Sequence, residues 1–156
     1  MAKDEDGNSG TTKGRVLGVG GVFFRSPDPA RLAAWYREAL GIDTESWGET
    51  HGSSFAPGGM PPHAFTVWSV FPQATDYLGP PSQGFMINLV VDDLDIALAR
   101  VRGAGGTVFD DREEADFGRF GWFEDPDGNR VELWEPPANM PDGVEAEGAG
   151  GDGDAP

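Results

Sequence analysis

Apolar and polar positions in the first part of the chain follow a strand period and then a helix period. Residues 16–25 are rich in β-branched and aromatic side chains, which are typical of strands. Apolar residues then recur at helical spacing over residues 30–40. Ser26 is suited to cap this helix at its N-terminus, Asp28 to lie in its first turn and Gly41 to end it. The pattern therefore predicts a strand followed by an amphipathic helix.

The same order returns in the second half of the chain. Residues 85–91 predict a strand, residues 94–101 a helix, and the glycine-rich residues 103–106 the end of that helix. Short strand candidates follow both helices, near residues 42–47, 53–55, 64–71, 107–109, 119–124 and 130–134. We therefore expect an α+β fold of two strand–helix–strand–strand–strand modules, one at about 16–72 and one at about 85–136. Since only two such units exist, they must cover each other.

Alternation along the predicted strands assigns their side chains to two faces. Val131 and Leu133 share one face of the last strand, while Glu132 and Trp134 share the other. The apolar face suits packing under a helix. The opposite face mixes indole, carboxylate and amide groups, a combination that is typical of a ligand-binding cleft. The same mixed face also fits a solvated surface or a contact between subunits.

A turn signal joins the last two predicted strands. Residues 125–128, Asp-Pro-Asp-Gly, place proline second and glycine fourth, as a tight turn prefers. Counting outward from this turn predicts that Trp122 lies opposite Glu132 and Phe120 opposite Trp134. Partial burial beside these rings would raise the pKa of the Glu132 carboxyl, unless a nearby cation offsets it.

Composition and charge narrow the classes of function. The 156-residue chain has a formal net charge of −16, which disfavours binding to nucleic acids and to anionic membrane surfaces. It contains no cysteine, which excludes disulfides, thiolate metal ligands and a cysteine nucleophile. No apolar run has the length of a membrane span. We therefore expect a cytoplasmic protein with no nucleic-acid partner and no membrane partner.

The two ends of the chain lack an apolar period. Residues 1–14 carry mainly polar residues and glycine, and residues 138–156 contain five acidic residues and no basic one. Such segments bury too little apolar surface to offset the entropy of ordering. We expect a disordered head and a disordered acidic tail around one folded domain at 15–137. Within the domain, the acidic run 110–116 is predicted to be a solvated loop.

Three segments resemble a known superfamily. Residues 120–136, FGWFEDPDGNRVELWEP, resemble the closing hairpin of the vicinal oxygen chelate superfamily. This group includes glyoxalase I, extradiol dioxygenases and bleomycin-resistance proteins. Residues 34–42 resemble the end of its first helix, and residues 91–97 the entry to its second. The resemblance covers roughly residues 16–137. It implies tandem βαβββ modules whose eight strands curl around a cleft with the helices outside, and it implies a homodimer.

The resemblance also locates the metal-binding positions of the superfamily. Metal-dependent members hold a divalent ion with residues from four strands, usually His or Glu, and these positions fall here on Gly21, Trp68, Met86 and Glu132. Side chains of Gly and Trp cannot coordinate a hard cation. We therefore expect no cofactor. If a divalent metal does bind, Glu132 is the position that would hold it.

The candidate site combines the predicted cleft-facing residues. The expected ligand-binding residues are Phe23, Trp68, Met86, Asn88, Arg119, Phe120, Trp122, Glu132 and Trp134. Aromatic groups offer stacking area, and an acidic cleft favours a cation. The first hypothesis is accordingly a glyoxalase- or bleomycin-resistance-like protein that binds a small aromatic or cationic molecule.

Two other hypotheses remain open. In the first, the protein is a divergent lyase, isomerase or dioxygenase-type enzyme in which Glu132 is catalytic, either through an atypical metal site or as a general acid or base. In the second, the same aromatic side chains pack a dimer interface.

Overall fold

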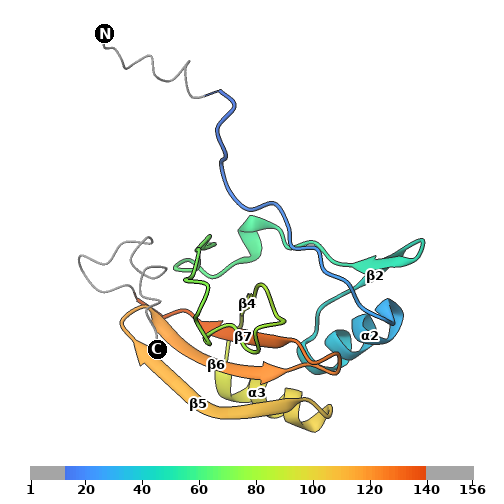
Figure 1. The fold of residues 1–156 in the computed structure, drawn as a ribbon. Coiled ribbons are helices and arrows are strands. Elements are labelled where there is room, and N and C mark those ends of the chain that lie inside the picture. The colour runs from blue at the N-terminus through green and yellow to red at the C-terminus, as the bar shows by residue number, and fades with distance from the viewer. Residues whose placement is uncertain (1–12, 140–156) are drawn as a thin grey trace.

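The computed structural model describes residues 13–139 (Figure 1). They form an α+β fold with two α-helices and two sheets. The elements in order are α2 (Pro29–Leu40), β2 (Glu45–Trp47), β3 (Thr50–Gly52), the 3-10 turn η1 (Pro57–Gly59), β4 (Ile87–Val90), α3 (Leu94–Gly103), β5 (Thr107–Ala115), β6 (Gly118–Glu124) and β7 (Arg130–Glu135). The predicted disordered head and tail lie almost wholly outside the described residues. No helix within the described residues is long and apolar enough to cross a membrane.

A four-stranded sheet is built by the second half of the chain. Its strand order is β4-β7-β6-β5. Strands β4 and β7 run parallel, whereas β7, β6 and β5 are joined by antiparallel pairing. Helix α3 connects β4 to β5, so the strand–helix–strand–strand–strand order predicted for the second module is confirmed. Strands β2 and β3 form a separate two-stranded antiparallel hairpin.

The hairpin of β6 and β7 has the predicted register. Trp122 lies opposite Glu132, and Phe120 lies opposite Trp134. The turn closes through the backbone N–H of Asp125, which donates to the carbonyl of Asn129 at 2.9 Å. Because side chains alternate along each strand, this register fixes which groups share a face with Glu132.

The hydrophobic core lies between the two helices and one face of the four-stranded sheet, which we call the back face. The sheet contributes Phe123, Val131 and Leu133, all at most 1% exposed. The helices contribute Leu32, Tyr36, Leu94, Ala97, Leu98 and Val101. Gly121 lets α3 approach closely, because a Cβ there would lie 2.8 Å from Leu98 Cδ1. The predicted apolar face of the last strand is therefore confirmed.

The start of α2 differs from the sequence prediction. Asp28, not Ser26, is the N-cap, since its carboxylate accepts a hydrogen bond from the Arg31 backbone N–H at 3.2 Å. Pro29 then occupies the first helical position. Ser26 lies two residues too early to cap, and its hydroxyl donates instead to the Asp127 carboxylate. Gly41 ends the helix with a φ of 72°, as predicted.

The first half of the chain contains fewer strands than expected. Residues 16–25 and 64–71, predicted as strands, form no ladder, and β3 lies at Thr50–Gly52 instead of 53–55. Figure 1 shows the segment before α2 extending away from the sheets. The three glycines within residues 16–25 weaken its strand preference, and its side chains have no facing surface to pack on. The described residues thus form sheets of two and four strands in place of one curled sheet of eight.

The acidic run 110–116 also differs from its prediction. Strand β5 continues to Ala115, so nearly all of the run is strand and not loop. Its side chains are exposed, as a solvated run requires. Antiparallel pairing with β6 supplies the backbone hydrogen bonds that keep these charged residues in an extended chain, after a register shift between Val108 and Arg112.

A buried hydrogen bond ties α2 to the β6–β7 turn and gives a test of this fold. Tyr36 Oη donates to Asp125 Oδ2 at 2.8 Å, and both residues are buried. Replacing Tyr36 by Phe leaves the carboxylate short of a donor, so we expect Y36F to lower the free energy of unfolding by about 1–3 kcal/mol. S26A, which loses an exposed bond to the same turn, should cost about 0.5 kcal/mol or less. Urea unfolding of both variants measures the difference, and equal losses would contradict this packing.

Candidate functional site

The face of the four-stranded sheet opposite the core carries one carboxylate among aromatic rings. We call it the front face, and its central residues are Phe120, Trp122, Glu132 and Trp134 from the β6–β7 hairpin. Glu132 is 7% exposed, and Trp122 and Trp134 are 4% exposed each. A carboxylate is rarely buried unless it is paired, so the contacts of Glu132 decide what this face can do.

Glu132 accepts hydrogen bonds from three side chains of different segments. The Trp122 indole Nε1 donates to Oε2 at 3.1 Å from the neighbouring strand. The Asn88 amide donates to Oε1 at 2.7 Å from β4, where Asn88 lies beside Glu132 in the parallel register. The Tyr77 hydroxyl donates to Oε2. These donors satisfy much of the hydrogen-bonding capacity that burial would otherwise leave unmet.

Burial changes the protonation of both Glu132 and Tyr77. Burial raises the pKa of the Glu132 carboxyl above its ordinary value, and the hydrogen bonds from Tyr77, Asn88 and Trp122 oppose that rise in part. Burial, together with the neighbouring Glu132 charge, raises the pKa of the Tyr77 hydroxyl far above its ordinary range. Tyr77 therefore stays protonated and remains a hydrogen-bond donor to Glu132.

Aromatic rings pack against the ring of Tyr77, next to Glu132. The Tyr77 ring stacks on Phe71 at a centroid distance of 5.3 Å, with 6° between the planes. The Tyr77 ring also meets Trp122 edge-on at 6.1 Å. Such pairs add roughly 0.5–1.5 kcal/mol each beyond the area that they bury. A flat ring therefore already fits beside Glu132 on this face.

A second aromatic group lies at Trp134. Phe120 stacks on Trp134 at 6.2 Å with 6° between the planes, and Phe65 meets it edge-on at 5.0 Å. Phe65 and Phe71 come from the segment between η1 and β4. Within the described residues this segment forms neither helix nor strand, yet it supplies rings to the front face.

Arg130 places a cation at the edge of the same face. Its guanidinium carbon lies 4.8 Å from the centre of the Phe109 ring and 5.7 Å from that of Trp122. Arg130 lies opposite Glu124 across the hairpin, yet within residues 13–139 the two form no ion pair. Its Nε is buried with no hydrogen-bond partner among those residues. Stacking on aromatic rings is thus what holds this cation.

The structure brings together only part of the predicted site. Phe120, Trp122, Glu132 and Trp134 share the front face, and Asn88 joins them through its bond to Glu132. Phe23 is 92% exposed and Trp68 79% exposed, so neither packs beside Glu132. Met86 is half-buried and directly precedes β4.

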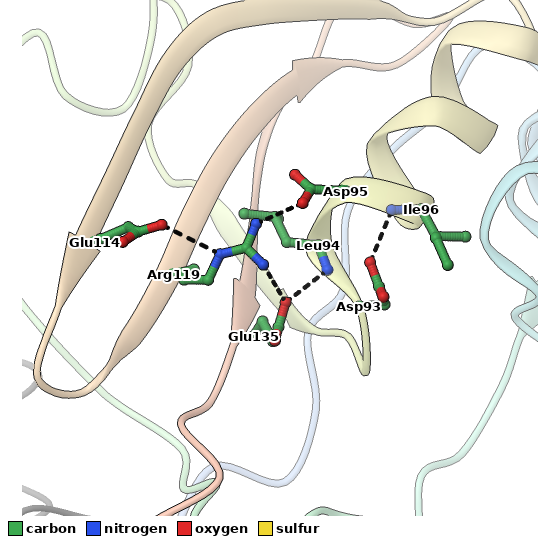
Figure 2. A network of polar contacts seen from close by, with 7 residues as sticks. All are labelled: Asp93, Leu94, Asp95, Ile96, Glu114, Arg119 and Glu135. Carbon is green, nitrogen blue, oxygen red and sulfur yellow. Dashed lines mark hydrogen bonds and ion pairs between the residues drawn. The ribbon is translucent and has the colours of Figure 1, made fainter.

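Arg119 belongs to a different cluster, which Figure 2 shows. Its guanidinium pairs with Asp95 at 2.9 Å, Glu135 at 3.1 Å and Glu114 at 3.6 Å. Glu135 also accepts a hydrogen bond from the Leu94 backbone N–H at 2.8 Å, at the start of α3. Arg119 was expected to bind ligand, but alternation turns it away from the Trp122 face and toward α3. Its charge is neutralised at the entry of this helix.

Tyr77 is the main residue that sequence reasoning missed. It lies in a segment rich in proline and glycine, where neither strand nor helix periodicity assigns a side chain to a face. One signal was present, because a tyrosine flanked by turn residues needs a partner for its hydroxyl if it is buried. The chain has two tyrosines, and both donate to a carboxylate of the β6–β7 hairpin.

The residues on this face do not fit a divalent metal ion. The family positions Gly21 and Trp68 offer no oxygen or imidazole ligand, and Glu132 already accepts three hydrogen bonds. Within residues 13–139, no three side chains of His, Asp or Glu are grouped so that they could hold an ion. We therefore derive no chemical step through a metal.

Comparison with known proteins found one matching family and several similar structures. Residues 21–134 match a family described as a glyoxalase-like domain. Three solved structures are similar over most of their own lengths. The first is the antibiotic-binding protein TnmS3 from a Streptomyces species, with 22% identity over 79% of this chain and 98% of that chain and a TM-score of 0.48. The second is a glyoxalase/bleomycin resistance protein/dioxygenase superfamily member from Sphaerobacter thermophilus, with 22% identity over 77% of this chain and 98% of that chain and a TM-score of 0.48. The third is a lactoylglutathione lyase from Agrobacterium tumefaciens, with 16% identity over 78% of this chain and 95% of that chain and a TM-score of 0.45. No curated protein matches the chain.

The raised pKa of Glu132 predicts how stability depends on pH. Folded Glu132 holds its proton more tightly than the unfolded chain does, so losing that proton lowers stability. The free energy of unfolding of the wild type relative to E132Q should therefore fall as the pH rises from the ordinary value of 4.5 through the raised pKa. Urea unfolding of both proteins between pH 4 and 8 measures this difference. A difference that rises across the window would contradict the assignment.

Proposed function

We propose that this chain, which belongs to the glyoxalase-like domain family of the vicinal oxygen chelate superfamily, binds a small aromatic or cationic molecule on the front face of its four-stranded sheet. The observation that carries the proposal is the buried Glu132 carboxylate, held by three donors from three segments. Burying a charge costs stability unless the charge is paired. A carboxylate kept at this cost beside the buried Trp122 and Trp134 rings is suited to recognise a ligand.

The surroundings of Glu132 define the ligand by its chemistry. Rings at Trp122, Phe120 and Trp134 offer flat surfaces on which a planar molecule can stack. The carboxylate accepts hydrogen bonds or pairs with a cation, and the chain's net charge of −16 attracts cations and repels anions. A planar molecule with a cationic or hydrogen-bond-donating group meets both requirements.

Catalysis by Glu132 is the second candidate function. Burial raises the pKa of its carboxyl, and a carboxyl group whose pKa is raised toward neutrality can act as a general acid or base. A divergent lyase, isomerase or dioxygenase-type reaction would then use Glu132 to move a proton at the bound molecule. The two candidates differ in one respect: in the enzyme, E132Q would still bind substrate but lose turnover.

The charge of the ligand gives a direct test of the binding site. We expect 1-naphthylmethylammonium to bind the wild type at least about tenfold more tightly than 1-naphthoate, because only the cation pairs with Glu132. In E132Q this ratio should fall severalfold, since the ring contacts remain and the charge is gone. Isothermal titration calorimetry at low salt measures both affinities. Equal preference in the two proteins would place the binding site elsewhere.

We also propose that the protein forms a homodimer through the strand-like residues of its first half. Several large apolar side chains there are exposed, namely Val16, Leu17, Phe23, Val67, Trp68 and Val70. Several large apolar side chains exposed in two short segments support an interface with another protein chain. The fold leaves these side chains without a facing surface, and a second copy would supply one.

The dimer proposal is tested by the mass of the protein in solution. Light scattering after size exclusion should give twice the mass of one chain for the wild type, and the mass of one chain for the double variant F23D/W68D. Charged side chains at two largely exposed positions oppose burial in an interface without disturbing the core. F55D, at another exposed phenylalanine outside this segment, is the matched control and should stay dimeric. A wild type that scatters as one chain would overturn the proposal.

A further inference from the structure

The segment of residues 72–84 lies over the front face with few attachments to it. Its backbone hydrogen bonds are internal turns, from Thr75 to Pro72, from Gly79 to Asp76 and from Gln83 to Pro80. It forms neither helix nor strand. Among the described residues, no backbone hydrogen bond joins this segment to the sheet. Only side chains hold it there.

Two side chains make those attachments, and they differ in kind. Gln83 binds the backbone of Arg130 twice, accepting from its N–H at 2.8 Å and donating to its carbonyl at 2.8 Å. Tyr77 binds the Glu132 side chain through one hydroxyl. Gln83 lies at the end of the segment next to β4, and Tyr77 lies near its middle. The segment is therefore held to the sheet backbone at Gln83 and to one side chain, Glu132, at Tyr77.

Tyr77 makes the contacts that a bound aromatic molecule would make. Its ring stacks on Phe71 and meets Trp122 edge-on. Its hydroxyl donates to Glu132 beside the Trp122 indole N–H. Ring stacking and one O–H donor to a buried carboxylate together describe how this face would hold a phenol.

We propose that Tyr77 occupies the place of the ligand, and that a hydroxyl-bearing aromatic molecule binds Glu132 by displacing Tyr77. This inference rests on the proposed function and narrows its ligand class to hydroxyarenes. Displacement breaks one side-chain hydrogen bond and the contacts of one ring, while Gln83 keeps its bonds to Arg130. The segment then opens without disturbing the core on the back face.

The burial of Glu132 explains why the ligand must bring a donor. Removing Tyr77 leaves Oε2 with the Trp122 N–H as its remaining protein donor. An apolar ring that displaced Tyr77 would leave a buried acceptor short of a partner, which weakens the binding of that ring. A hydroxyl group restores that hydrogen bond. The site therefore discriminates a hydroxyarene from its methyl ether, although the two have nearly the same ring.

Calorimetric titration of the full chain with 2-naphthol tests the displacement. We expect Y77A to bind 2-naphthol about tenfold more tightly than the wild type, as it would if the open form were about one tenth populated in the wild type. The matched ligand 2-methoxynaphthalene, which has no donor, should bind Y77A more weakly than 2-naphthol does, because it cannot replace the lost hydrogen bond to Glu132. F55A removes an exposed phenylalanine elsewhere and should bind 2-naphthol as the wild type does.

A second measurement follows binding in the wild type itself and uses a variant only to assign a resonance. The chain has two tyrosines, so tyrosine labelled with carbon-13 at Cζ gives two resonances. Saturating 2-naphthol should shift the Tyr77 resonance, which Y77F identifies by its absence, and leave that of core residue Tyr36 in place. If 2-naphthol binds but Tyr77 does not shift and Y77A gains no affinity, the displacement is overturned while the proposed function stands. If neither 2-naphthol nor 1-naphthylmethylammonium binds, both are overturned.

Discussion

The buried carboxylate of Glu132 is the constraint around which the front face is organised. A charge with 7% exposure has to be met by donors, and three segments supply them: β6 through Trp122, β4 through Asn88 and the 72–84 segment through Tyr77. Each donor reaches Glu132 because the sheet register puts it there or because a turn-rich segment folds over the sheet. The back face carries the hydrophobic core, so the front face can carry a buried polar group whose hydrogen bonds are met by these three donors.

Most of the second module could be predicted from its sequence, because local rules act there in agreement with one another. The Asp-Pro-Asp-Gly turn set the register of the hairpin, and the register set the neighbours of Glu132. In the first module, helical spacing and Gly41 also located α2 and its end. Where two rules competed, the prediction was wrong: both Ser26 and Asp28 suit an N-cap, and Pro29 at the first helical position selects Asp28.

Most strands of the first module and part of the site could not be predicted, for reasons that lie in tertiary structure. Strand propensity alone does not make a strand, and residues 16–25 contain the right side chains but have no partner to pair with. Arg119 directly precedes Phe120, yet the alternation of side chains along β6 points it toward α3, where three carboxylates neutralise its charge. Tyr77 reaches Glu132 across 55 positions of sequence through a segment with no period. Of the metal positions that the resemblance implies, Gly21 and Trp68 cannot coordinate an ion through their side chains, so the resemblance located Glu132 without giving its role.

The most direct test of the claim that a ligand binds beside Glu132 is to measure which tryptophan resonances shift when a ligand is added. The chain has five, and each indole N–H gives one resonance in a nitrogen–proton correlation spectrum. On titration with 1-naphthylmethylammonium, the account predicts a shift of the Trp122 resonance, whose N–H donates to Glu132. It predicts no shift for Trp35, whose N–H donates to the Ala104 carbonyl on the core side. A titration that moved Trp47 or Trp68 and left Trp122 unchanged would contradict the account.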